Sequence, residues 1–120
     1  MPYGFSELEW SAAVAEMTNV LQRRATSRSM ITYSDLANEI RTVQIGYHDP
    51  AMDGMLSVVS NNEFASGRGL LSVIVVHKYG DMEPGLGFYE LAQSLGLDVS
   101  DRVKCWIREL HRVHDYWSNG

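Results

Sequence analysis

One short segment, Leu70–His77, most constrains the fold, because it is the clearest strand in the sequence; Ile31–Ser34 is expected to be only a short extended entry to a helix. It is rich in β-branched residues and bounded by glycine, which is typical of a buried strand. The chain around it lacks the alternation of strands and helices that a doubly wound sheet requires. Lys78–Gly87 holds three glycines and one proline, so we expect a turn or hairpin tip there, followed at most by a very short returning strand.

The apolar residues elsewhere follow helical spacing. Five helices are predicted, over residues 6–25, 35–41, 50–60, 88–95 and from 100 toward the C-terminus. Four of them begin at a residue whose side chain can cap the first turn: Ser6, Ser34, Asp49 and Ser100. The apolar stripe of the last helix predicts its buried face: Val103, Trp106, Ile107, Leu110, Val113 and Trp117.

Three short helices followed by a strand and a glycine-rich turn are typical of a winged helix. At 120 residues the chain has the length of one domain. We therefore expect a single domain over residues 1–120, of the α+β class and mostly α. Its predicted architecture is winged-helix-like, a three-helix core plus a short β-hairpin wing, with extra helices at the C-terminus.

The net charge and the cysteine content exclude some kinds of function and disfavour others. Ten Lys and Arg against fifteen Asp and Glu give a net charge of −5, whereas nucleic-acid-binding proteins are usually basic. Cys105 is the single cysteine, which excludes an intramolecular disulfide and a cysteine metal cage. The longest apolar run, Leu70–Val76, is too short to span a bilayer, and the N-terminus does not resemble a secretory signal. We expect a soluble cytoplasmic protein without a membrane partner.

The run Ile31-Thr32-Tyr33-Ser34-Asp35-Leu36-Ala37 resembles the entry to the winged-helix domain of O6-alkylguanine-DNA alkyltransferases and the alkyltransferase-like proteins. The order that follows is also similar: a loop, a helix near Pro50, a strand and then His77. Separately, the passage from Leu70 to Ala92 resembles a pattern in small uncharacterised winged-helix-like proteins of bacterial or phage type, LLSxxVV-K … MPG-GFFELA. That second resemblance implies a shared fold and no function.

Two departures from the alkyltransferase pattern bear on activity. The position that matches the family's acceptor cysteine is Val76, which cannot accept an alkyl group. The family's recognition helix carries an arginine that enters the base stack, and the matching position here is Asp53, whose charge repels phosphate. We therefore predict no alkyl transfer, no catalytic residue, no cofactor and no metal site.

Two functions remain open. The first is a non-enzymatic winged-helix module that binds double-stranded DNA through phosphate contacts. Its candidate contacts are Arg23, Arg24, Arg28, Tyr33, Ser34, Arg68 and Lys78. The second is a protein-interaction or dimerisation module without nucleic-acid affinity. The absence of Lys and Arg from 42–67 favours this alternative, as do aromatic residues such as Tyr3 and Trp10 near the N-terminus.

The histidines carry less information. His77 ends the predicted strand and is expected to be a half-buried boundary residue; an enzyme that uses it with a carboxylate is the third and weakest hypothesis. His111 and His114 are spaced like metal ligands, but no third ligand is near in the sequence. We expect both on a solvated helix face. Gly80, Gly85 and Gly87 match no phosphate-binding loop and are interpreted as turn residues.

Overall fold

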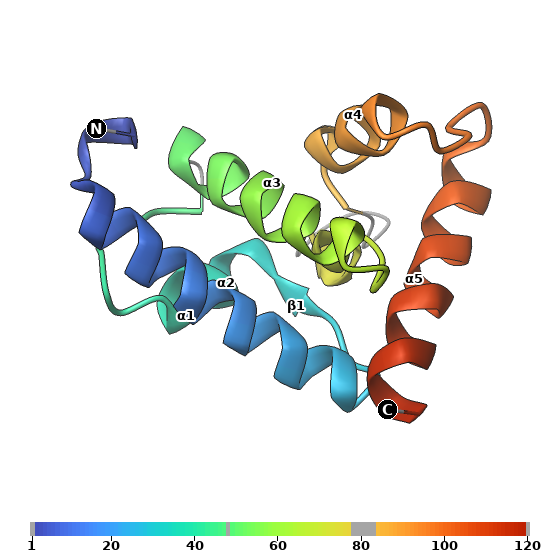
Figure 1. Ribbon diagram of the computed structural model, residues 1–120, viewed down its shortest axis with the longest axis horizontal. Coiled ribbons are helices and arrows are strands. Elements are labelled where there is room, and N and C mark those ends of the chain that lie inside the picture. Colours follow the sequence, from blue (N-terminus) through green and yellow to red (C-terminus); the bar gives the residue numbers. More distant parts are fainter. Residues whose placement is uncertain (1, 48, 78–83, 120) are drawn as a thin grey trace.

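Five helices, two 3-10 turns and two very short strands make up the computed structural model, which describes residues 2–47, 49–77 and 84–119. The helices are α1 Glu7–Thr26, α2 Tyr33–Glu39, α3 Pro50–Ala65, α4 Leu86–Ser94 and α5 Arg102–Asn119. The 3-10 turns are η1 Pro2–Gly4 and η2 Leu71–Ile74, and the strands are β1 Ile31–Thr32 and β2 Val75–Val76. The predicted mostly helical domain with five helices is confirmed. Figure 1 shows α1 and α3 side by side, with α5 along one edge of the molecule.

The start of α1 follows directly from the sequence. The Ser6 hydroxyl accepts a hydrogen bond from the Glu9 N–H at 3.0 Å, and the Glu9 carboxylate accepts one from the Ser6 N–H at 2.9 Å. This reciprocal capping box satisfies two N–H groups that the helix itself leaves unpaired. The predicted Ser6 cap is confirmed. The inner face of α1 is fully buried at Met17 and Leu21.

Two other predicted caps are wrong. The hydroxyl that accepts from the Asp35 N–H is that of Thr32, at 3.2 Å, so α2 begins before Ser34. At α5 the Asp101 carboxylate accepts from the Lys104 N–H at 3.2 Å, while Ser100 donates to Asp98 instead. In both cases two neighbouring polar residues could cap the helix, and the helix begins at the one that the sequence pattern did not select.

Helix α3 begins as predicted and continues further. Asp49 caps it by accepting from the Ala51 N–H at 3.0 Å, and Pro50 occupies the first turn. The helix runs to Ala65 rather than ending near residue 60. Its last turn is stabilised by Glu63, which is 1% exposed and accepts a hydrogen bond from the Gln22 side chain of α1 at 2.7 Å. A contact between segments far apart in the sequence thus extends the helix.

The predicted strand Leu70–His77 is mostly a 3-10 turn, η2, and only its last part, β2, is extended. Residues 70–76 are all buried, and a fully buried apolar run does not distinguish strand from helix. β2 pairs in parallel with β1, with Ile31 opposite Val75 and Thr32 opposite Val76. The two described strands therefore do not form the predicted hairpin wing, and the tip expected at 78–83 lies outside the described residues.

The buried face of α5 is also rotated from the predicted one. Of the six apolar residues expected inside, Val113 is fully buried, whereas Val103 and Ile107 are 50% and 43% exposed. Cys105, Glu109 and His114 are buried instead. Helix α5 packs on α1 and η2, and two of its buried polar residues bind backbone there: Glu109 accepts from the buried Leu70 N–H, and His114 lies against the Ser29 carbonyl just after α1. No helix in the described part of the chain is long and apolar enough to cross a membrane.

Candidate functional site: an acidic pocket beside α3 and α4

A pocket of about 320 Å³ opens where the first turns of α2, α3 and α4 meet the end of β2. It combines aromatic rings, carboxylates and glycine backbone. Its lining residues are Tyr33, Tyr47, Asp49, Asp53, His77, Gly85, Leu86 and Gly87. The parallel strand pair positions two of these residues, because Tyr33 directly follows β1 and His77 directly follows β2.

Tyr33 fixes the inner wall of this pocket. Its hydroxyl oxygen accepts a hydrogen bond from the Gly85 N–H at 3.1 Å, and its ring lies 5.1 Å from the His77 ring, centroid to centroid. A Cβ at position 85 would lie 2.8 Å from that hydroxyl, so the close approach requires glycine. Burial raises the pKa of Tyr33, and the negative charge of Asp53 raises it further. The phenol therefore stays protonated at neutral pH.

Two carboxylates from the first turn of α3 give the pocket its charge. Asp49 caps the helix through one oxygen, and Asp53 is exposed. A Cβ at Gly87 would lie 3.9 Å from the Asp53 carboxylate, which places that carboxylate against the start of α4. Neither aspartate forms an ion pair with a Lys or Arg among the described residues. The pocket therefore presents negative charge that this part of the chain does not neutralise.

Three of the arginines predicted to contact DNA are bound by carboxylates of the same chain. Arg24 pairs with Glu39 at 3.1 Å and also donates to the Met30 carbonyl. Arg28 pairs with Asp115 at 2.9 Å and donates to the Ser118 hydroxyl. Arg68 pairs with Glu63, which raises the pKa of Arg68. Contact with phosphate would have to compete with each of these pairs.

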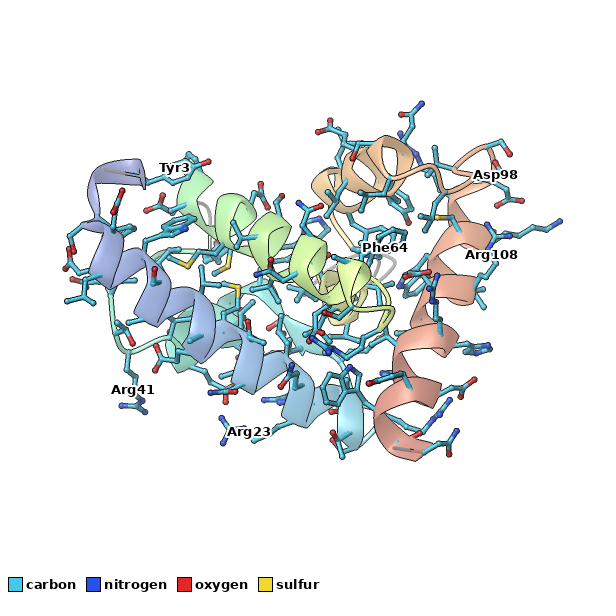
Figure 2. The ribbon with its side chains drawn as sticks, in the orientation of Figure 1. Tyr3, Arg23, Arg41, Phe64, Asp98 and Arg108 are labelled. Atoms are coloured by element: carbon cyan, nitrogen blue, oxygen red, sulfur yellow. The ribbon has the colours of Figure 1, made fainter. Side chains whose placement is uncertain are left out.

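Three of the other four candidate contacts lie within the described residues, and none of the three forms an ion pair there. Arg23, in the last turn of α1, is exposed and has no ion pair within the described residues. Tyr33 lines the acidic pocket with Asp53, and the Ser34 hydroxyl lies 3.3 Å from the Thr32 hydroxyl. Lys78 lies outside the described residues. Figure 2 shows Arg23 pointing away from the molecule at the outer side of α1. The seven residues remain a prediction of a DNA surface.

The structure corrects two of the three predictions made for the burial of the histidines. His77 is exposed at the pocket rather than half buried. His114 is only 6% exposed, and its Nε2 lies 3.1 Å from the Ser29 carbonyl, so the solvated face predicted for it is wrong. His111 is exposed as expected. No group of three His, Cys, Asp or Glu in the described ranges is arranged to hold a metal ion.

The absence of Lys and Arg from 42–67 is visible in the sequence, but the pocket that Asp49 and Asp53 of this stretch line is not. The contact between Tyr33 and Gly85 joins the starts of α2 and α4, and no local pattern predicts it. Glycines beside the start of a helix were the available signal, because they permit a close backbone approach. Comparison with protein families, characterised proteins and solved structures finds no match to this chain. The pocket's geometry and charge are therefore the observations that bear on function.

Proposed function

We propose that this protein is a non-enzymatic binding module that takes a positively charged segment of a protein partner at the acidic pocket. The observation that carries this proposal is the contrast in charge pairing. Asp49 and Asp53 have no basic partner in the described residues, whereas Arg24, Arg28 and Arg68 each have an acidic one. The pocket should therefore attract a cation, whereas phosphate would have to displace a carboxylate from each of these arginines.

The pocket chemistry favours an arginine side chain as the group that is bound. A guanidinium can donate in a fork to a carboxylate and can stack on an aromatic ring. The pocket offers the Asp53 carboxylate beside the ring of Tyr33, and it is large enough to receive one side chain. A lysine would gain the charge attraction but not the forked hydrogen bonds.

Fluorescence anisotropy with a labelled oligoarginine peptide tests the proposal, with a labelled duplex DNA of equal charge measured in parallel. We expect the peptide to bind at about 50 mM salt and more weakly at about 200 mM, and the DNA not to bind. Asp53→Asn removes one pocket charge and should weaken peptide binding roughly threefold to tenfold. Asp98→Asn is the matched control, because it removes a charge from the α4–α5 loop and keeps an oxygen that can accept from Ser100.

Double-stranded DNA is the competing partner, bound by a winged-helix-like surface. The exposed Arg23 supports this candidate, since it is available to phosphate without breaking an ion pair in the described residues. If DNA binds with a steep salt dependence and Arg23→Glu flattens that dependence, the cationic-partner proposal is wrong. Equal loss of peptide binding in Asp53→Asn and Asp98→Asn would also contradict it, because the peptide would then respond only to net charge.

A further inference from the structure

We propose that the groove between α1 and α3 is a self-association surface and that a second copy of this chain occupies it. The groove measures about 560 Å³ and follows the line along which the two helices pack. Its α1 wall includes Trp10, Val14 and Thr18, and its α3 wall includes Val58 and Asn62. This inference stands independently of the acidic pocket and of the proposed cationic partner.

The absence of charged residues from the groove favours a second copy of this chain as its partner. None of its lining residues is ionisable, although the chain as a whole carries a net charge of −5. A twofold interface brings the same patch of both copies together, so a charge near the twofold axis would face its own like charge. An uncharged groove avoids that repulsion, while the acidic pocket beside α4 would not. A charged peptide, in contrast, would gain no electrostatic attraction from this groove.

An exposed leucine supplies the group that a second copy would insert. Leu8 is 82% exposed, more than any other large apolar side chain in the described residues. It lies one helical turn before Ser11, which lines the groove, so both residues lie on one face of α1. Ala12 and Ala15 continue that face and are exposed. Their small side chains allow another helix to approach closely, which brings Leu8 of each copy over the groove of its partner.

An aromatic anchor lies at the same end of the groove. Trp10 is half buried and stacks on Tyr3, with 5.5 Å between the ring centroids. Figure 2 shows Tyr3 beside the first turn of α3, where its ring covers Gly54. Large aromatic side chains are enriched at the centres of protein interfaces. Two copies joined here would form a four-helix arrangement from two α1 and two α3 helices.

Sedimentation equilibrium of the full chain from about 1 μM to about 300 μM tests this inference. We expect a mass that rises with concentration from 13.5 kDa toward twice that value. Ala15→Arg places a large charged side chain in the uncharged groove and should raise the dimer dissociation constant at least tenfold. Leu8→Glu should do the same without affecting folding, because Leu8 is almost fully exposed.

Gln93→Arg on the exposed side of α4 is the matched control and should leave the dimer unchanged. Urea unfolding of each variant verifies that the fold is retained. A monomer at every concentration overturns the inference. A dimer that neither Leu8→Glu nor Ala15→Arg weakens overturns it as well, because the interface then lies elsewhere.

Discussion

The carboxylate of Glu109 on α5 accepts a hydrogen bond from the backbone N–H of Leu70, with 2.7 Å between Oε2 and nitrogen. Glu109 is only 3% exposed, and its other oxygen lies 3.8 Å from the Arg112 guanidinium. Glu63 of α3, equally buried, binds Arg68 two positions earlier in the same connection. Two carboxylates from different helices thus secure the segment that joins α3 to η2.

Removal of the Glu109 carboxylate should destabilise the fold. Glu109→Ala leaves a buried N–H without an acceptor, and we expect a loss of roughly 1–3 kcal/mol in the free energy of unfolding. Glu109→Gln keeps an oxygen for Leu70 and should cost less. Urea unfolding of the three proteins measures the difference. Equal midpoints for wild type and Glu109→Ala would show that water replaces the carboxylate at Leu70.

Two glycines in the same connection should differ in their tolerance of a methyl group. Gly67 and Gly69 both have positive φ, at 78° and 90°, so alanine at either position costs roughly 1–2 kcal/mol in backbone strain. A Cβ at Gly69 would also lie 3.0 Å from Val113 and 3.1 Å from Glu109, whereas one at Gly67 meets open space. We therefore expect Gly69→Ala to lower the unfolding midpoint more than Gly67→Ala. The reverse order would be inconsistent with the described packing of α5.

Acid should weaken the attachment of the segment after α2. The Glu16 carboxylate accepts hydrogen bonds from the backbone N–H groups of Arg41 and Thr42, both at 2.9 Å. The bond from Thr42 is the main reason that the pKa of Glu16 lies below its ordinary value of 4.5. A carboxyl group whose pKa is lowered by folding stabilises the fold at any pH above its pKa in the unfolded chain. This stabilisation is lost as the pH falls through its pKa in the folded protein.

Glu16→Gln is the variant that isolates this effect. The difference in unfolding free energy between wild type and Glu16→Gln should be constant above about pH 5.5 and should shrink below pH 4.5. Unfolding in urea at a series of pH values measures it. A difference that stays constant down to pH 3 would mean that Glu16 does not titrate with folding.

A second pH dependence should arise from His114. Burial lowers its pKa below the ordinary value of 6.5, and the nearby Arg28 guanidinium acts in the same direction. Because the unfolded chain then binds the proton more readily, stability should fall as pH drops below about 6.5. His114→Gln should remove this slope, since the amide can still donate to the Ser29 carbonyl but does not titrate. His111→Gln, on the exposed side of α5, should retain it.

Local signals predicted the helices well and the contacts between them poorly. The Ser6 cap and the Asp49–Pro50 start of α3 depend on neighbours within one turn, and both are confirmed. The rotation of α5 depends on Leu70 and Ser29, which are remote in sequence from Glu109 and His114. An apolar stripe shows where hydrophobic residues lie, but it does not show which buried backbone groups need a polar partner.

The same limit applies to the candidate site. The sequence indicated a stretch without Lys or Arg and placed Asp53 on a helix that begins at Pro50. These two features account for the negative charge of the pocket. The pocket also depends on the parallel pairing that brings Tyr33 and His77 together, and no local pattern predicts that Ile31–Thr32 pairs with Val75–Val76. The ion pairs of Arg24 and Arg28 likewise join residues of separate segments, which local hydrophobic periodicity does not connect.

The parallel pairing of β1 with β2 has a kinetic consequence. Unlike a hairpin, it cannot form from adjacent residues, because α2, the loop that follows and α3 all separate Ile31 from Val75. The entropy of closing that long loop has to be offset by packing that α1, α3 and η2 provide. We therefore expect these few strand hydrogen bonds to form late in folding, so that weakening them accelerates unfolding more than it slows refolding.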